Sequence, residues 1–114
     1  MAYEVIITDR AQEQADAFID YLVNVKKNPQ AALNLFQDID DTKESLSLIA
    51  GALGYCSDPD LKSRKYKIMF FRHMRYLWIF RIENNRVEIM AMYHQLQDYE
   101  NLFKAESGHF SIDT

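Results

Sequence analysis

Hydrophobic and polar positions follow two different periods along the chain, and the change of period separates a helical part from a stranded part. A short β-rich run over residues 3–7 predicts a strand. Between residues 8 and 50, apolar residues recur at spacings of three and four, which is typical of one face of a helix. Asn28-Pro29 divides this stretch, because proline is tolerated at the first helical position but not inside a helix. The pattern therefore predicts a strand followed by two antiparallel helices.

Each helix has an apolar side that is expected to face the core. Thr8 or Asp9 begins the first helix as its N-cap. The expected core residues of the first helix are Ala11, Ala15, Phe18, Leu22 and Val25. The expected core residues of the second helix are Ala32, Phe36, Ile39, Leu46 and Ala50.

The second half of the chain alternates with a period of two. A loop at residues 51–63, which contains glycine, proline and aspartate, separates it from the helices. The alternation predicts strands over 64–71, 76–83 and 86–94. Because the connections are short, these three strands are expected to form an antiparallel meander.

The register of the last two strands follows from a two-residue turn at Asn84-Asn85, since asparagine tolerates the left-handed backbone of such turns. In this register Arg75 faces His94 and Tyr76 faces Tyr93. Tyr93 then lies on the core face and His94 on the opposite face. Residues on that opposite face also include an apolar patch made of Leu77, Ile79, Met90 and Met92. A patch of this kind is expected to be covered by a partner.

The first strand of the meander has two possible registers. One register sends Tyr66, Ile68 and Phe70 to the core and leaves Lys65 and Lys67 on the outer face. A slip by one residue would bury both lysines, so the first register is the expected one.

These elements predict an α+β protein: an N-terminal strand, an antiparallel two-helix hairpin, a three-stranded antiparallel meander and a short C-terminal helix that begins after Asp98. The single domain is expected over residues 1–104, with a polar C-terminal tail at 105–114. No apolar segment approaches the roughly 20 residues that cross a bilayer, and the chain has one cysteine. We therefore expect a cytoplasmic protein without a membrane partner.

The charge distribution is uneven. The formal net charge is -4, yet the segment 62–86 carries eight lysines and arginines against the single acid Glu83. A cationic sheet on an acidic body predicts an anionic ligand for the sheet. No metal or cofactor is expected, because the three histidines have no metal-ligand spacing and the chain has no glycine-rich phosphate loop.

Five segments in this order resemble the RelE/ParE superfamily of bacterial type II toxin–antitoxin toxins. They are Tyr3 to Thr8, the Asn28-Pro29-Gln30-Ala31-Ala32 junction, Arg64 to Ile68, Tyr76 to Asn85 and Tyr93 to Glu100. The resemblance implies a toxin that is neutralised by a cognate antitoxin protein. It also implies one of two activities: ribosome-dependent mRNA cleavage, as in RelE-like members, or inhibition of DNA gyrase, as in ParE-like members.

The first of these activities, an mRNA interferase that works without metal, is the leading expectation. It would use His94, with Tyr93, as the acid or base, since an imidazole takes up and releases protons near neutral pH. Four cations would contact the phosphates: Lys65, Lys67, Arg75 and Arg81. The alternatives are structural. His94 would anchor a strand end, Tyr93 would pack on Tyr76, Arg81 would pair with Glu88, and the cations would be solvated or receive an acidic antitoxin segment.

Two departures from the RelE-like pattern favour the other activities. Leu77 stands where RelE-type nucleases have an arginine, and Gln95-Leu96-Gln97 stands where the superfamily usually has Gly-Arg-Arg. Both departures remove positive charge from the expected scissile phosphate. A gyrase inhibitor without nuclease activity, or a protein that binds antitoxin but has lost its toxicity, is therefore the alternative.

Overall fold

The computed structural model describes residues 2–112, and the side chains of residues 2–106. The elements, in chain order, are β1 (Glu4–Ile7), α1 (Asp9–Asn24), α2 (Pro29–Ile49), the 3-10 turn η1 (Ala50–Ala52), α3 (Pro59–Ser63), β2 (Lys67–Phe70), β3 (Tyr76–Glu83), β4 (Arg86–His94) and α4 (Tyr99–Ile112). The predicted α+β class and element order are confirmed, with α3 and η1 added within the predicted loop.

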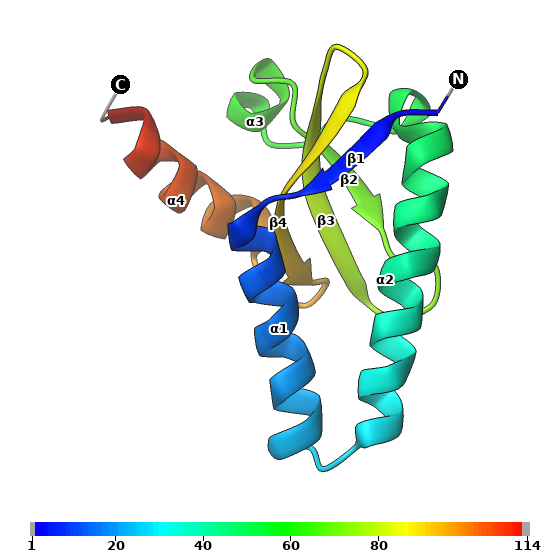
Figure 1. Ribbon diagram of the computed structural model, residues 1–114. Helices are drawn as coiled ribbons and strands as arrows, with labels where there is room; N and C mark the ends of the chain where they lie inside the picture. The colour runs from blue at the N-terminus through cyan, green and yellow to red at the C-terminus, as the bar shows by residue number, and fades with distance from the viewer. Residues whose placement is uncertain (1, 113–114) are drawn as a thin grey trace.

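The four strands form one sheet in the order β1-β4-β3-β2, in which β1 runs parallel to β4 and the other pairs are antiparallel. The hairpin of α1 and α2 covers one face of the sheet (Figure 1), where Trp78 and Phe80 of β3 pack against Ala15 and Leu35. Leu61 of α3 and Phe103 of α4 belong to a second core on the other face. The sheet therefore has an apolar core on each side.

The start of each long helix agrees with the sequence. Thr8 is the N-cap of α1, and its hydroxyl accepts a hydrogen bond from the backbone N–H of Ala11 at 3.3 Å. The same hydroxyl donates to the carbonyl of Ile89 at 2.8 Å, which ties the helix to β4. Asn28 caps α2 and Pro29 occupies its first position. Side-chain caps of this kind satisfy N–H groups that have no partner inside the helix.

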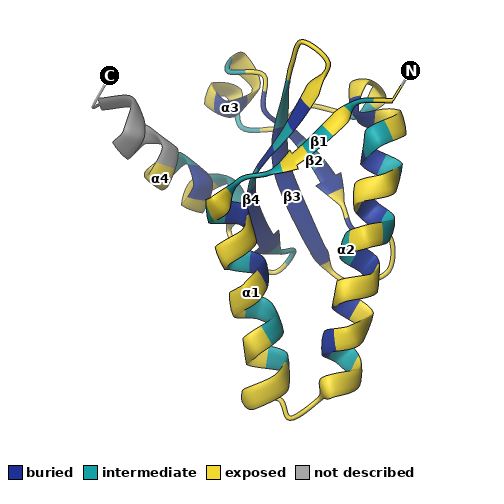
Figure 2. Ribbon diagram, viewed as in Figure 1, coloured by how far each residue is buried: buried dark blue, intermediate teal, exposed yellow. Residues whose placement is uncertain are grey.

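The core-facing sides of the helices were predicted only in part. Phe36 is 53% exposed and Val25 is 65% exposed, and the far end of the helical hairpin is exposed on both helices (Figure 2). In α2 the buried positions include Leu35, Asp38 and Thr42 instead. The buried pair of polar residues has a structural role, because the Asp38 carboxylate holds the loop between β2 and β3.

A β-bulge in β4 overturns the simple hairpin register. Ile79 pairs with Ala91 whereas Phe80 pairs with Ile89, so Met90 is the extra residue. Beyond the bulge every side chain of β4 changes face relative to the prediction. His94 therefore pairs with Tyr76 on the face that α1 and α2 cover, whereas Tyr93 pairs with Leu77 and lies in the other core.

The predicted register of β2 is also wrong. Lys67 pairs with Phe80 and Met69 pairs with Trp78, so Met69 lies in the core under the helices and Lys67 is 8% exposed. The loop from β2 to β3 spans residues 71–75. The pairing is shifted by one residue from the expected register, and the burial of Lys67 is compensated by its hydrogen bond to the carbonyl of Leu53.

The apolar patch of Leu77, Ile79, Met90 and Met92, which the sequence predicts to be covered by a partner protein, is covered by other parts of this chain. Leu77 and Ile79 are fully buried in the core that contains Leu61 and Phe103, and Met92 lies in the core on the other face. The prediction of a partner for this patch is therefore wrong. The helix responsible, α4, runs to Ile112 and so includes most of the predicted polar tail. His109 and residues 113–114 lie outside the described side chains.

No helix in the described part of the chain is both long and apolar enough to cross a membrane.

Candidate functional site

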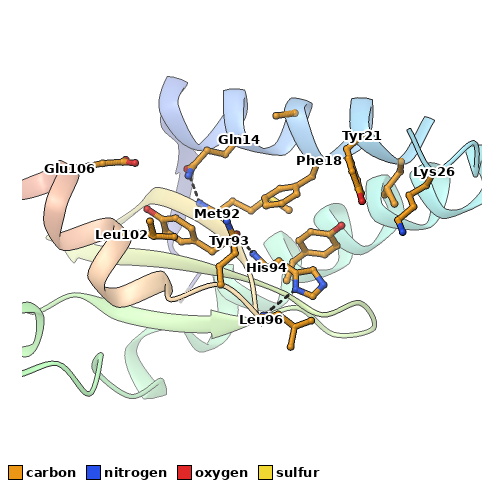
Figure 3. A pocket seen from close by; sticks show the side chains of 14 residues that line it. Gln14, Phe18, Tyr21, Lys26, Met92, Tyr93, His94, Leu96, Leu102 and Glu106 are labelled. Carbon is orange, nitrogen blue, oxygen red and sulfur yellow. Dashed lines mark hydrogen bonds between the residues drawn. The ribbon is translucent and has the colours of Figure 1, made fainter. Parts of the chain in front are cut away.

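A groove of about 910 Å³ lies between α1, the end of β4 and α4 (Figure 3). Its walls are mostly apolar and aromatic. The lining residues are Gln14, Ala17, Phe18, Tyr21, Leu22, Lys26, Tyr76, Met92, Tyr93, His94, Leu96, Gln97, Leu102 and Glu106. Concave apolar surfaces with a few polar groups are the usual form of a binding site.

His94 lines this groove and organises the turn that follows β4. Its ring lies edge-on to Tyr76, with centroids 5.1 Å apart. Nδ1 accepts a hydrogen bond from the backbone N–H of Leu96 at 3.1 Å. The backbone N–H of His94 donates to Oε1 of Gln97 at 2.8 Å. A nitrogen that accepts a hydrogen bond carries no proton, so the neutral ring has its proton on Nε2. This geometry matches the strand-end anchor that the sequence left as the alternative to catalysis.

Tyr93 is 3% exposed and belongs to the core beneath α4. Its hydroxyl accepts a hydrogen bond from Nη2 of Arg10 at 3.2 Å. Arg10 also forms an ion pair with Glu106, which links the start of α1 to α4. The Tyr93 hydroxyl therefore has a partner within the protein, and the expected packing on Tyr76 does not occur, because the bulge turns Tyr93 to the other face.

Two of the four predicted phosphate ligands are engaged elsewhere. Nζ of Lys67 donates to the carbonyl of Leu53 at 2.5 Å and lies 4.4 Å from the centroid of the Tyr55 ring. Nε of Arg81 pairs with Glu88 at 3.2 Å, as the alternative reading expected. Both cations are therefore compensated inside the protein.

The other two cations, Lys65 and Arg75, are exposed and lie apart from each other. The carbonyl of Arg75 accepts from the N–H of Gln95 at 2.9 Å, so this residue adjoins the turn that carries His94. Lys65 precedes β2 with a left-handed backbone, at φ 67°. Lys67 pairs with Phe80, and His94 pairs with Tyr76 at the start of β3. Ordinary strand spacing therefore places the backbones of Lys67 and His94 about 16 Å apart.

The predicted site residues thus divide into two groups. His94, Tyr93 and Arg75 lie at one end of the sheet, and the predicted phosphate ligands Lys65, Lys67 and Arg81 do not join them. Among the described residues, no cluster of histidine, cysteine and acidic side chains could hold a metal ion.

The side chains of Gln14 and Gln97 bond to the backbone of β4, a role that the sequence pattern does not indicate. β1 pairs with β4 only as far as Ile89, so the outer edge of β4 beyond that point has no neighbouring strand. Gln14 accepts from the N–H of Met92 at 2.9 Å, and Gln97 does the same for His94. These two side chains satisfy backbone groups at an open sheet edge. Gln14 lies four residues before Phe18 and therefore on the same face of α1, which is the only sequence signal that Gln14 faces the sheet.

Burial shifts two titratable groups near the cores. It raises the pKa of Tyr76, with a smaller contribution from Tyr21. It also raises the pKa of the Cys56 thiol to about 12, again with a smaller contribution from Glu100. The Cys56 thiol therefore stays protonated at neutral pH and is not a nucleophile.

The fold agrees with what comparison to known proteins finds. The family described as the ParE toxin of the type II toxin–antitoxin system, parDE, matches residues 5–99. A solved structure, titled as the chromosomal ParDE TA system from P. aeruginosa, is 21% identical with a TM-score of 0.67, and the match covers 82% of this chain and 96% of that one. No curated protein matches. The chain is a RelE/ParE-superfamily α+β protein, and within that class it belongs to the ParE toxin family.

Proposed function

We propose that this chain is the toxin of a type II toxin–antitoxin pair, that an antitoxin encoded beside it holds it inactive, and that it arrests growth by inhibiting DNA gyrase in the cytoplasm. The observation that carries the proposal is the separation of the expected nuclease groups. Lys67 and Arg81 are bonded within the protein, and Leu77 is buried where a RelE-like nuclease has an arginine. RNA cleavage without metal needs an acid or base and several cations at one phosphate.

The groove supports the antitoxin part of the proposal. Leu96 is 83% exposed, and Tyr21 and Leu102 are 44% and 40% exposed around the same groove. Grouped apolar side chains of this kind are typical of a protein interface. Lys26 lies at the end of α1 that is far from Glu106, so a bound segment with apolar residues and an acid near Lys26 would complement the groove.

mRNA cleavage is the second candidate, because His94, Tyr93 and Arg75 do lie together at one end of the sheet. The two candidates differ in what they require of His94. As a general acid or base, His94 would contribute about 100-fold or more to the rate. As a strand anchor, it would contribute little to the inhibition of gyrase.

We expect the purified toxin to inhibit supercoiling of relaxed plasmid by gyrase, and we expect His94→Ala to retain most of that inhibition. His94→Ala should retain the inhibition because the His94 side chain bonds mainly to its own turn. In cells that express the toxin without antitoxin, thymidine incorporation should fall before methionine incorporation. Early loss of methionine incorporation, together with an inactive but folded His94→Ala, would instead support mRNA cleavage.

A further inference from the structure

α4 lies almost wholly beyond the residues that match the ParE family. The matched region ends at residue 99, and α4 begins at Tyr99 and continues to Ile112. The match to the ParDE structure covers 96% of that chain and 82% of this one. Apart from Tyr99, α4 therefore lies outside the part of this chain that the family model matches.

Two contacts on the side of α4 that faces the sheet hold it in place. Phe103 is 2% exposed and packs edge-on against Tyr66, with ring centroids 4.9 Å apart. Nζ of Lys104 lies 3.1 Å from a carboxylate oxygen of Asp58. An element held by a buried aromatic residue and a partly buried ion pair forms a defined surface rather than a loose tail.

The start and the middle of α4 carry two further links. Glu100 accepts hydrogen bonds from the hydroxyl of Ser57 and the N–H of Asp58, each at 3.0 Å. Glu106 pairs with Arg10 at the start of α1. The second link joins α4 to the opposite wall of the groove, so it fixes the spacing of the two walls at this end.

Leu102 and Phe103 point in different directions, because successive residues of a helix are rotated by about 100°. Phe103 enters the core, whereas Leu102 is 40% exposed and lines the groove across from α1 (Figure 3). With Leu96 it supplies apolar surface from outside α1. A partner that fills the groove must contact this surface.

We propose that α4 is the wall of the antitoxin groove that determines selectivity, with Leu102 as its contact residue. The occupant is the apolar face of the segment with which the cognate antitoxin docks, and the acid of that segment lies toward Lys26. Antitoxins whose docking segments do not fit against α4 are excluded by it. The inference rests on the proposed antitoxin partnership and adds the residue that selects among antitoxins.

The first test compares Leu102→Glu with Ala105→Glu in the full chain, titrated with the antitoxin encoded beside this toxin. Ala105 is exposed on the same helix and does not line the groove. We expect Leu102→Glu to weaken binding by about tenfold or more, because it places a carboxylate against an apolar partner, and Ala105→Glu to bind as the wild type does. Equal affinities for the two variants would overturn the inference.

The second test measures selectivity with the antitoxin of the P. aeruginosa ParDE system as the competing probe. Leu102→Ala should narrow the difference in affinity between the two antitoxins, by about tenfold. An unchanged difference would contradict a selective role for α4.

A third variant separates this inference from the proposed function. Ala17→Arg blocks the groove from the α1 side, since Ala17 is a lining residue. If Ala17→Arg abolishes antitoxin binding while Leu102→Glu does not, the groove is the docking site and the α4 inference is wrong. If both variants bind normally, the groove itself is wrong. Inhibition of gyrase by the same variants, without antitoxin, tests the toxin activity independently.

Discussion

Replacing Asp38 by alanine is expected to lower the free energy of unfolding by about 3–5 kcal/mol, a large part of the stability of a domain of this size. Asp38 is 1% exposed, and its carboxylate accepts from the N–H of Met74 at 2.7 Å and from the N–H of His73 at 3.2 Å. The alanine variant removes the carboxylate that accepts from both of these N–H groups. Each N–H left without its charged acceptor costs about 1.5–3 kcal/mol.

Asp40→Ala is the matched control, because Asp40 is an exposed aspartate on the same helix. Urea unfolding measures the difference in the free energy of unfolding between the two variants, provided that both have the same dependence on urea concentration. Asp38→Asn keeps one acceptor oxygen and should lie between the wild type and Asp38→Ala. If Asp38→Ala were as stable as Asp40→Ala, the loop between β2 and β3 would not depend on this carboxylate.

The order of the elements could be predicted because each boundary has a local cause. Thr8 and Asn28 cap helices through bonds to residues three positions further along the chain. Pro29 starts α2 and Asn84 has a left-handed backbone in the hairpin turn, at φ 58°. Such signals involve neighbouring residues, so the sequence alone contains them.

The faces of the strands could not be predicted beyond the turn, because a single residue decides them. The pairs Ile82–Val87 and Arg81–Glu88 are as expected, and the bulge at Met90 reverses everything that follows. No glycine or other local signal marks Met90 as an extra residue. This one reversal moved His94 to the helix side of the sheet, and with it the centre of the candidate site.

The burial of Lys67 has a cause that is distant in sequence. The sequence favours the register that leaves Lys67 on the outer face, because a buried lysine without a partner is costly. The carbonyl of Leu53 and the ring of Tyr55 supply that partner, and both come from the segment that precedes α3. Asp38 acts across a longer separation when it holds the loop at residues 71–75, because it accepts from N–H groups 35 and 36 residues further along the chain. Contacts of this kind are properties of the tertiary structure, which the periodicity of the strand does not contain.

Leu77→Arg is expected to lower the free energy of unfolding by more than about 4 kcal/mol and to leave little folded protein. Leu77 is fully buried in the core with Ile79, Ala91 and Phe103. An arginine there would place a charge in an apolar core and would need more volume than the leucine leaves. We therefore expect the packing around position 77 to be incompatible with the arginine of RelE-like nucleases.

Leu96→Arg is the matched control, because it makes the same chemical change at a leucine that is 83% exposed. We expect its unfolding midpoint to match that of the wild type, whereas Leu77→Arg should unfold at much lower denaturant or be recovered insoluble. Circular dichroism during urea titration distinguishes the two. If Leu77→Arg remained folded and cleaved mRNA on the ribosome, position 77 would belong to a nuclease site and not to a closed core. If it unfolds, as we expect, position 77 belongs to the core that α4 covers, and the absence of an arginine is a consequence of this packing.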